Sequence, residues 1–189
     1  MADFIRNGYG QVEPNHLSAQ KTGQIYAQLP ADSSINQLEN GQFVKYDYKA
    51  GKVDFSTDAA AGEWMMVFNE VHTYDERDRF YKDFVMAKVD YVDGVITPRV
   101  IKTNVGDIFT TNTLAPATSG DVSARRKDTV LIAEADRTTN LALGAIYQVG
   151  TNGFLEYKAT PTAGQPQFAV VKVYTLADGQ EAIKFQRVA

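Results

Sequence analysis

Residues 168–188 read FAVVKVYTLADGQEAIKFQRV, and this stretch carries the clearest secondary-structure pattern in the chain. Apolar, aromatic and β-branched residues recur on both sides of a central turn, over 168–175 and 180–188. The turn contains Asp178-Gly179, a dipeptide that favours the type I′ turn of a tight β-hairpin. We therefore expect this stretch to form an antiparallel hairpin.

Short strand-like segments separated by turn residues fill the chain from Asn40 onward. Long amphipathic helices are not expected, because an apolar period of about 3.6 residues is not sustained. The charged segment 74–82 fits either one short helix or an exposed loop. Asp93-Gly94 and Asn152-Gly153 favour further tight turns. The pattern predicts a mainly β fold, with strands within 42–48, 53–55, 63–71, 84–92, 95–102, 106–114, 130–135, 144–149 and 154–157.

Two regions of the sequence resemble each other at a separation of 102 or 103 residues. Each region contains a strand, a tight turn, a second strand, a small-residue loop and a longer apolar strand. Few residues are identical, so an internal duplication and a chance similarity between two β-meanders both explain the resemblance. The glycines that occupy corresponding places are Gly41, Gly51 and Gly62 in the first region and Gly144, Gly153 and Gly164 in the second.

The first 39 residues differ from the rest, because Gly and Pro interrupt them and no apolar period is sustained. Their dispersed larger apolar residues are nevertheless too many for a disordered tail. We expect residues 1–39 to form an extended N-terminal arm that lies on another subunit, outside the core of its own chain. The composition of 116–128 is typical of a linker. It separates a β-domain at 40–115 from a second β-domain at 129–189, each a small β-barrel or β-sandwich.

The composition excludes several classes of protein. The 189 residues carry a formal net charge of −4, so the basic excess of a typical nucleic-acid binder is missing. The absence of cysteine removes disulfides, thiol nucleophiles and cysteine-ligated zinc. The first residues lack the apolar core of a signal peptide, and no stretch approaches the roughly 20 apolar residues of a membrane span. We expect a soluble protein made in the cytoplasm, without nucleic-acid or membrane partners.

Residues with catalytic or metal-binding chemistry form no recognisable motif. Neither histidine has a second ligand or an orienting carboxylate at a characteristic spacing. The carboxylates at 75–78 alternate with arginines, and Arg125-Arg126-Lys127 precedes an aspartate, so both stretches are expected to be solvated. We predict no catalytic, cofactor-binding or metal-binding residue, no cofactor and no enzymatic activity. The residues considered for such roles are Gly8, Gly10, His16, His72, Asp75, Glu76, Asp78, Asp90 and Asp93.

The aromatic residues allow a second interpretation. Trp64, ten tyrosines and ten phenylalanines are compatible with sugar stacking in a small β binding module. Most of them lie within apolar strand segments, where aromatic side chains pack in cores and interfaces. Packing is therefore the favoured role.

Several of these segments together resemble a known family. The phrases are 41–44 (GQFV), 51–53 (GKV) and 62–67 (GEWMMV), the corresponding region 144–173, and the closing strand 181–188. They are similar to the small β-barrel capsid decoration (cement) proteins, or auxiliary head proteins, of tailed bacteriophages. The likeness covers most of residues 40–189. The duplication and the inserted region 74–114 depart from the simplest decoration pattern.

This resemblance implies a non-enzymatic virion structural protein. Such a protein binds the capsid exterior and stabilises contacts between neighbouring capsomers. The implied partners are the major capsid protein and further copies of the chain, and the implied location is the capsid surface of the virion, after synthesis in the host cytoplasm. The alternatives are a phage tail or head–tail connector component, which is also β-rich and oligomeric, and a carbohydrate-binding or adhesion module.

Overall fold

The computed structural model describes residues 2–19, 28–56, 62–69, 83–88, 95–117 and 129–189. Its regular structure consists mostly of antiparallel strands, so the expected mainly β class is confirmed. The strands are β1 (Phe4–Arg6), β2 (Val12–His16), β3 (Gln37–Glu39), β4 (Phe43–Asp47), β5 (Lys52–Asp54), β6 (Glu63–Val67), β7 (Val85–Ala87), β8 (Val100–Ile101), β9 (Ile108–Thr111), β10 (Thr129–Ile132), β11 (Ile146–Val149), β12 (Leu155–Tyr157), β13 (Gln167–Thr175) and β14 (Glu181–Arg187). The described helical turns are η2 (Glu134–Asp136), α2 (Arg137–Asn140) and η3 (Thr151–Gly153).

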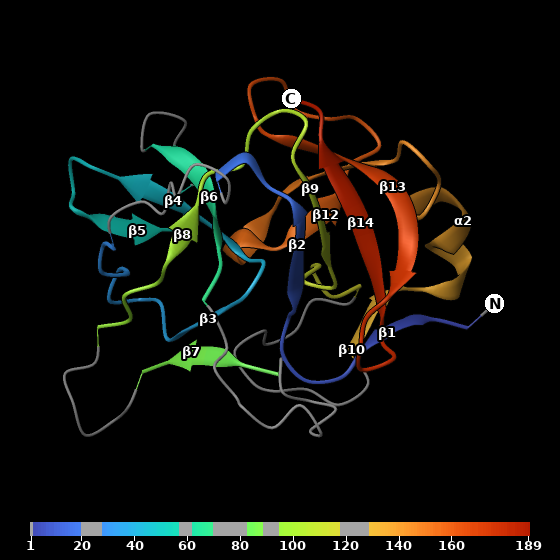
Figure 1. The fold of residues 1–189 in the computed structure, drawn as a ribbon, viewed down its shortest axis with the longest axis horizontal. Helices are drawn as coiled ribbons and strands as arrows, with labels where there is room; N and C mark the ends of the chain where they lie inside the picture. Colours follow the sequence, from blue (N-terminus) through green and yellow to red (C-terminus); the bar gives the residue numbers. More distant parts are fainter. Residues whose placement is uncertain (1, 20–27, 57–61, 70–82, 89–94, 118–128) are drawn as a thin grey trace.

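The largest sheet has six strands in the order β12-β11-β13-β14-β9-β2, and every neighbouring pair is antiparallel. Figure 1 shows β2, β9, β14 and β13 side by side. Strand β2 comes from the expected arm, β9 from the expected first domain and the others from the expected second domain. Distant parts of the sequence are therefore hydrogen-bonded within one sheet.

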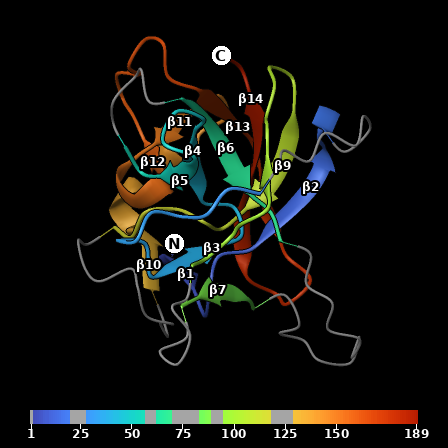
Figure 2. The ribbon, with the colours of Figure 1, turned by 90° about the vertical axis from the view of Figure 1, so that its left-hand side faces the viewer.

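A second sheet has four strands in the order β5-β4-β6-β8. Figure 2 shows it above the two-stranded sheet of β3 and β7, and β1 pairs separately with β10. One face of this second sheet forms a small hydrophobic cluster with residues around β3. The sheet contributes Val44, Val53 and Met65, and the chain around β3 contributes Ile35 and Leu38. The other face contributes Phe43, Trp64 and Met66 to the main core.

The two regions that resemble each other in sequence have the same strand order. Strand β4 lies between β5 and β6, and β11 lies between β12 and β13. The register is also the same: Phe43 is opposite Met66, and Ile146 and Ala169, each 103 residues further on, are opposite each other. We call residues 41–67 the first repeat and residues 144–175 the second repeat. All six corresponding glycines have a positive φ, which favours glycine: Gly41 (87°), Gly51 (65°), Gly62 (116°), Gly144 (81°), Gly153 (77°) and Gly164 (79°).

The main hydrophobic core joins the two repeats. The ring of Phe43 packs against the rings of Phe109 and Phe168, with centroid distances of 6.2 and 5.1 Å. The described strands form no closed barrel, and the expected domains 40–115 and 129–189 share this core as well as a sheet. The cause is the pairing of β9 with β14, which crosses the expected boundary. Separate folding of 129–189 stays a prediction, and the shared core favours one cooperative unit instead.

The N-terminal segment is extended, but the expectation that it lies outside the core of its own chain is wrong. Phe4 is 0% exposed, and Val12 and Leu17 also belong to the main core. Strand β1 pairs with β10 and β2 pairs with β9. The apolar residues are dispersed in the sequence because the segment runs past successive parts of the chain and is buried at a different point against each.

The C-terminal hairpin is confirmed. Strands β13 and β14 pair from Phe168–Arg187 to Thr175–Glu181, and Gly179 has a φ of 88°. The main-chain N–H of Leu176 donates to the oxygen of Gln180, so the loop contains three residues and not the two of a type I′ turn.

Most of the other expected strands are shorter in the structure, and β5 (Lys52–Asp54) is shifted by one residue from the expected 53–55. Segment 95–102 contains only the two-residue strand β8, because only this part pairs with β6. The turn at Asn152-Gly153 is confirmed, since both residues have a positive φ between β11 and β12. Segment 74–82 and Asp93-Gly94 lie outside the described residues.

Candidate functional site

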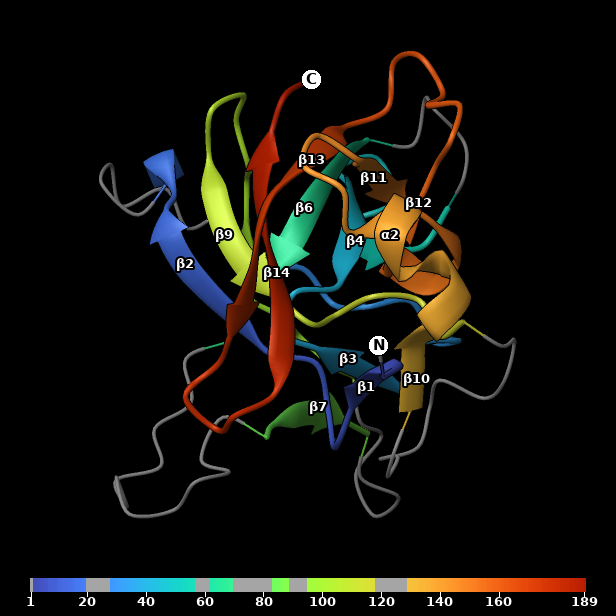
Figure 3. The same ribbon diagram turned by 90° about the vertical axis from the view of Figure 1, so that its right-hand side faces the viewer.

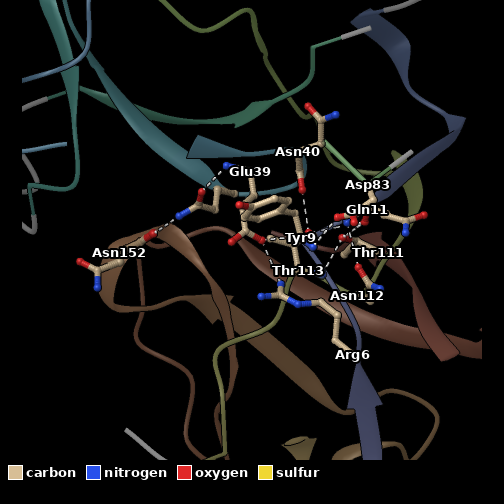
Figure 4. Close-up of polar contacts among 12 residues, drawn as sticks. Arg6, Tyr9, Gln11, Glu39, Asn40, Asp83, Thr111, Asn112, Thr113 and Asn152 are labelled. Carbon is tan, nitrogen blue, oxygen red and sulfur yellow. Dashed lines mark hydrogen bonds and ion pairs between the residues drawn. The ribbon is translucent and has the colours of Figure 1, made fainter. Parts of the chain in front are cut away.

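A buried polar network lies between the N-terminal segment and both sheets (Figure 4). Arg6 and Glu39 form an ion pair with 3.1 Å between Nη1 and Oε2, and their side chains are 4% and 1% exposed. The same Glu39 carboxylate accepts a hydrogen bond from the main-chain N–H of Gly10, at 2.5 Å. The N–H of Gln11 donates to Oδ1 of Asn112. Burial of the two charges is tolerated because they are paired with each other, and the Glu39 carboxylate also accepts a hydrogen bond.

Hydroxyl and amide side chains extend the network. Thr111 donates to the main-chain oxygen of Gln11, and Thr113 donates to that of Asn40. Asn40 in turn donates to the main-chain oxygen of Asn69 and accepts from its N–H. Most acceptors and donors here are main-chain groups of other segments, so the network fixes the N-terminal segment in place. Its role is structural.

Gly10 is required by this network. A Cβ atom at residue 10 would lie 2.3 Å from Oγ1 of Thr113 and 2.8 Å from Oε2 of Glu39, which is too close for any side chain. The main chain of residue 10 thus approaches the buried carboxylate directly. Gly10 is therefore required for close packing.

A cleft of about 530 Å³ lies where the two repeats meet. The first repeat lines it with Lys45, Glu63 and Trp64, and the second lines it with Gln165 and Gln167. In the common register, Trp64 and Gln167 are equivalent residues, since they are paired with Lys45 and Gln148, which are 103 residues apart. The cleft is therefore formed by corresponding edges of the two repeats. Arg187, at the end of β14, completes the lining.

The cations of this cleft are held in fixed positions. Nζ of Lys45 lies 5.4 Å from the centre of the Trp64 ring, a cation–π contact. Arg187 donates from Nη1 to both oxygens of Thr103 and from Nε to the main-chain oxygen of Ala189. Burial lowers the pKa of Arg187 from its ordinary value, because the charged guanidinium is partly removed from water.

The carboxylate in the cleft is already paired. Glu63 forms an ion pair with Lys102, with 2.8 Å between Oε2 and Nζ. Nε of Arg187 lies 3.0 Å from an oxygen of Ala189, the last residue of the sequence, where the main chain ends in a carboxylate. The arrangement thus places a guanidinium that already has an anionic neighbour beside a hollow of ligand size.

A second surface feature is the open edge of β13. Strand β11 pairs only with Gln167, Phe168 and Ala169, whereas β14 pairs with β13 up to Thr175. Figure 3 shows the β13–β14 hairpin leaving β11 and β12 toward the lower left. Within the described part of the chain, residues 171–175 have a strand on one side only.

The side chains on this open edge are partly apolar. Val171 is 40% exposed and Tyr174 is 38% exposed. Nζ of Lys184 lies 5.2 Å from the centre of the Tyr174 ring. The main-chain N–H of Leu176 donates across the hairpin to Gln180. Along an antiparallel strand, the main-chain N–H and C=O groups of successive residues point alternately to the two sides. The N–H and C=O groups of Val173 and Thr175 therefore point away from β14. An exposed edge of this kind is a template for pairing with another strand.

Of the residues considered for catalytic or binding roles, the structure describes Gly8, Gly10 and His16. His16 ends β2 and is exposed, opposite Ile108. Trp64 is 7% exposed and belongs to the core, which agrees with the packing role. Within the described ranges, no group of three or more His, Asp and Glu side chains is placed to hold a metal ion. The candidates outside these ranges are His72, Asp75, Glu76, Asp78, Asp90, Asp93 and Arg125-Arg126-Lys127.

Sequence reasoning missed Arg187 and Lys45, because neither belongs to a motif. The available signal was the internal resemblance: the loops at Gly62 and Gly164 correspond, and both line the cleft. Their meeting depends on how the repeats pack, which the spacing of the glycines does not reveal.

The comparisons with known proteins add no relative. No protein-family model, no curated protein and no solved structure matches the chain. None of the described helices has the length and apolar character to cross a membrane.

Proposed function

We propose that the protein is a non-enzymatic structural protein of a virion. It binds the exterior of a capsid and stabilises contacts between neighbouring capsomers, as the capsid decoration proteins of tailed bacteriophages do. The resemblance of 41–67 and 144–173 to those proteins motivates the proposal. The observation that carries it is the open edge of β13, because an unpaired strand edge is a surface at which another chain can add a strand.

The edge pairs with the same edge of a second copy. An antiparallel pair centred on Val173 has two-fold symmetry, the commonest symmetry of soluble oligomers. It places Lys172 of one copy opposite Tyr174 of the other, so the two lysines do not face each other. The chain already contains one such lysine–tyrosine contact, between Lys184 and Tyr174. The dimer then presents two identical sets of surfaces to adjacent copies of the major capsid protein.

Immunogold labelling of particles purified from the source of the sequence tests this function. An antibody against the recombinant chain is expected to label particle heads over their whole surface. Labelling restricted to tails or to the head–tail junction would contradict the proposal and favour the tail or connector alternative. Particles without label would contradict a virion role altogether.

A further inference from the structure

Two lysines face each other on the outer side of the β13–β14 hairpin. Lys172 and Lys184 are directly opposite in the antiparallel register. The next pair, Val173 and Ile183, packs in the main core, so the alternation of the strands places both lysines on the face away from the core. The Cβ atoms of such a pair lie about 5 Å apart, and like charges in this arrangement repel each other. An anion bound between them offsets the repulsion.

Neither lysine is neutralised by a carboxylate within the described part of the chain. Lys172 forms no ion pair there, and Nζ of Lys184 lies over the ring of Tyr174, 5.2 Å from its centre. By contrast, Lys158, beside β12 in the same sheet, forms an ion pair with Glu156 at 2.8 Å. The outer face of the hairpin therefore presents two positive charges to a partner.

The positive region is short. Across the sheet, Lys184 is opposite Thr110 of β9, and Thr110 is opposite Glu13 of β2. A carboxylate thus lies in the same row two strands away from Lys184, and the whole chain has a net charge of −4. A long polyanion such as a nucleic acid would meet this negative charge. One or two carboxylates fit the lysines without reaching it.

Exposed apolar groups adjoin the two charges. Tyr174 shares the face of Lys172, because it is two residues further along the strand, and it is 38% exposed. Val171, the extra residue of the bulge in β13, is 40% exposed. Tyrosine is enriched at protein interfaces because its ring offers a large apolar area with a polar tip. A protein segment that contains both acidic and apolar residues matches this combination.

We propose that the outer face of the β13–β14 hairpin binds an acidic segment of another protein. Its carboxylates pair with Lys172 and Lys184, and its apolar residues contact Tyr174 and Val171. The face is separate from the edge of β13, because side chains stand perpendicular to a sheet whereas an edge presents main-chain groups.

The proposed dimer would double this surface. Its two outer faces adjoin and present both lysines and the tyrosine of each copy; this doubling rests on the proposed function, whereas binding to one face does not. Exposed ion pairs contribute little singly, so a partner with two acidic segments gains most from two linked faces.

A short peptide with two glutamates, acetyl-Gly-Val-Glu-Val-Glu-Gly-amide, tests the proposal. Its glutamates lie on the same side when the chain is extended. In an NMR titration, the peptide is expected to shift the amide resonances of Lys172, Tyr174 and Lys184 in a saturable way, with a Kd of about 1 mM. The matched peptide with glutamine in place of both glutamates should bind at least about fivefold more weakly. Added NaCl should weaken the binding of the glutamate peptide.

Three variants assign the effect to this face. Lys172→Gln combined with Lys184→Gln should abolish the preference for the glutamate peptide without lowering the melting temperature, because it removes a repulsion. Lys49→Gln removes an exposed lysine from the loop between β4 and β5 and should leave the affinity unchanged. Lys172→Glu combined with Lys184→Glu should reverse the preference, in favour of a peptide with lysine in place of both glutamates. Circular dichroism establishes that each variant is folded.

The opposing outcomes are distinct. Equal affinities for the glutamate and glutamine peptides would overturn the role of charge, and an equal loss in Lys49→Gln would overturn the location. No saturable shift up to about 10 mM peptide would overturn the surface itself. Tighter binding of oligothymidylate or of phosphatidylserine vesicles would overturn an acidic protein segment as the partner. Dimerisation and virion labelling are measured separately, so a failure of peptide binding is distinguishable from a failure of the proposed function.

Discussion

The two repeats have the same strand order and register but differ at their third strands, β6 and β13. In the first repeat, β6 is followed across the sheet by β8, which pairs with Met66 and Val67. In the second repeat, β13 is longer and continues with β14 well beyond its last contact with β11. Both three-strand units thus have a further strand beside the third one, β8 or β14, but only β13 extends beyond the strand on its other side. The difference locates the edge at which the chain is available to a neighbour.

The strands at the ends of the two sheets, β5 and β12, each form a bridge to another segment in the same way. Ala31 forms a parallel bridge with Val53 of β5, and Leu114 forms one with Leu155 of β12. In the first bridge, the main-chain N–H of Val53 donates to Pro30 and its oxygen accepts from Asp32. In the second, the main-chain N–H of Leu155 donates to Thr113 and its oxygen accepts from Ala115. The bridging segments stand at different distances from their repeats in the sequence. The repeated unit therefore includes a fourth element that spacing alone does not reveal.

The largest expected effect comes from the contact between the repeats. Phe43→Ala removes a fully buried ring that touches Phe109 and Phe168, and should lower the free energy of unfolding by about 3–5 kcal/mol. Tyr48→Ala, at a residue that is 67% exposed, is the control and should cost less than about 1 kcal/mol. Urea unfolding measures both. Two separate transitions, of which the variant shifts only one, would contradict a core shared by the repeats.

Corresponding glycines should respond differently. A Cβ at Gly153 would lie 2.0 Å from the main-chain oxygen of Phe43, whereas a Cβ at Gly51 meets nothing within 4 Å. Gly51→Ala should cost about 1 kcal/mol from its positive φ alone, and Gly153→Ala about 2–4 kcal/mol because the repeats must also move apart. Equal melting temperatures for the two variants would show that Gly153 does not set the packing of the repeats.

A smaller, pH-dependent effect is expected at β5. The hydrogen bond from Lys52, followed by those from Ser34, lowers the pKa of Asp32 below its ordinary value of 3.8. Because the folded pKa is the lower one, the stabilisation is fully present above the unfolded pKa and is lost as the pH falls below about 4 toward the folded pKa. Asp32→Asn should therefore unfold slightly more easily than the parent at pH 7, and the difference should shrink below about pH 4.

Thermal melting of both proteins from pH 7 to pH 2.5 measures this difference. Lys52→Gln should reproduce it, since the hydrogen bond from Lys52 is the main cause of the lowered pKa. A gap between the melting curves that stays constant down to the lowest pH would argue against the pair.

Local patterns in the sequence predicted local structure well. The hairpin at Asp178-Gly179 and the corresponding glycines of the repeats could be recognised because hairpins depend on residues that are neighbours in the chain. The place of β2 and β9 beside β14 could not be recognised. The local sequence pattern of a strand does not show whether it lies at the edge or in the centre of a sheet. Residues 12–16 and 108–111 therefore do not identify their partner strands.

The N-terminal segment shows the same limit. Its lack of periodicity indicated that its apolar residues are buried at separate points. It did not indicate whether they are buried against another subunit or against the same chain. The buried pair of Arg6 and Glu39 and the hydrogen bond from Gly10 place that surface within the same chain. The cleft was equally hidden, because Lys45 and Arg187 meet only after the repeats pack.

Assembly through the β13 edge is tested most directly by sedimentation velocity with a pair of substitutions at one residue. The N–H of Thr175 points away from β14, so Thr175→Pro removes a donor of the open edge and leaves the pairing with β14 in place. Thr175→Ala keeps that donor and serves as the matched control. We expect the parent chain and Thr175→Ala to form dimers as concentration rises, and folded Thr175→Pro to remain monomeric. A parent chain that stays monomeric up to about 100 μM, well above the Kd of a typical specific dimer, or a proline variant that dimerises like the parent, would contradict assembly through this edge.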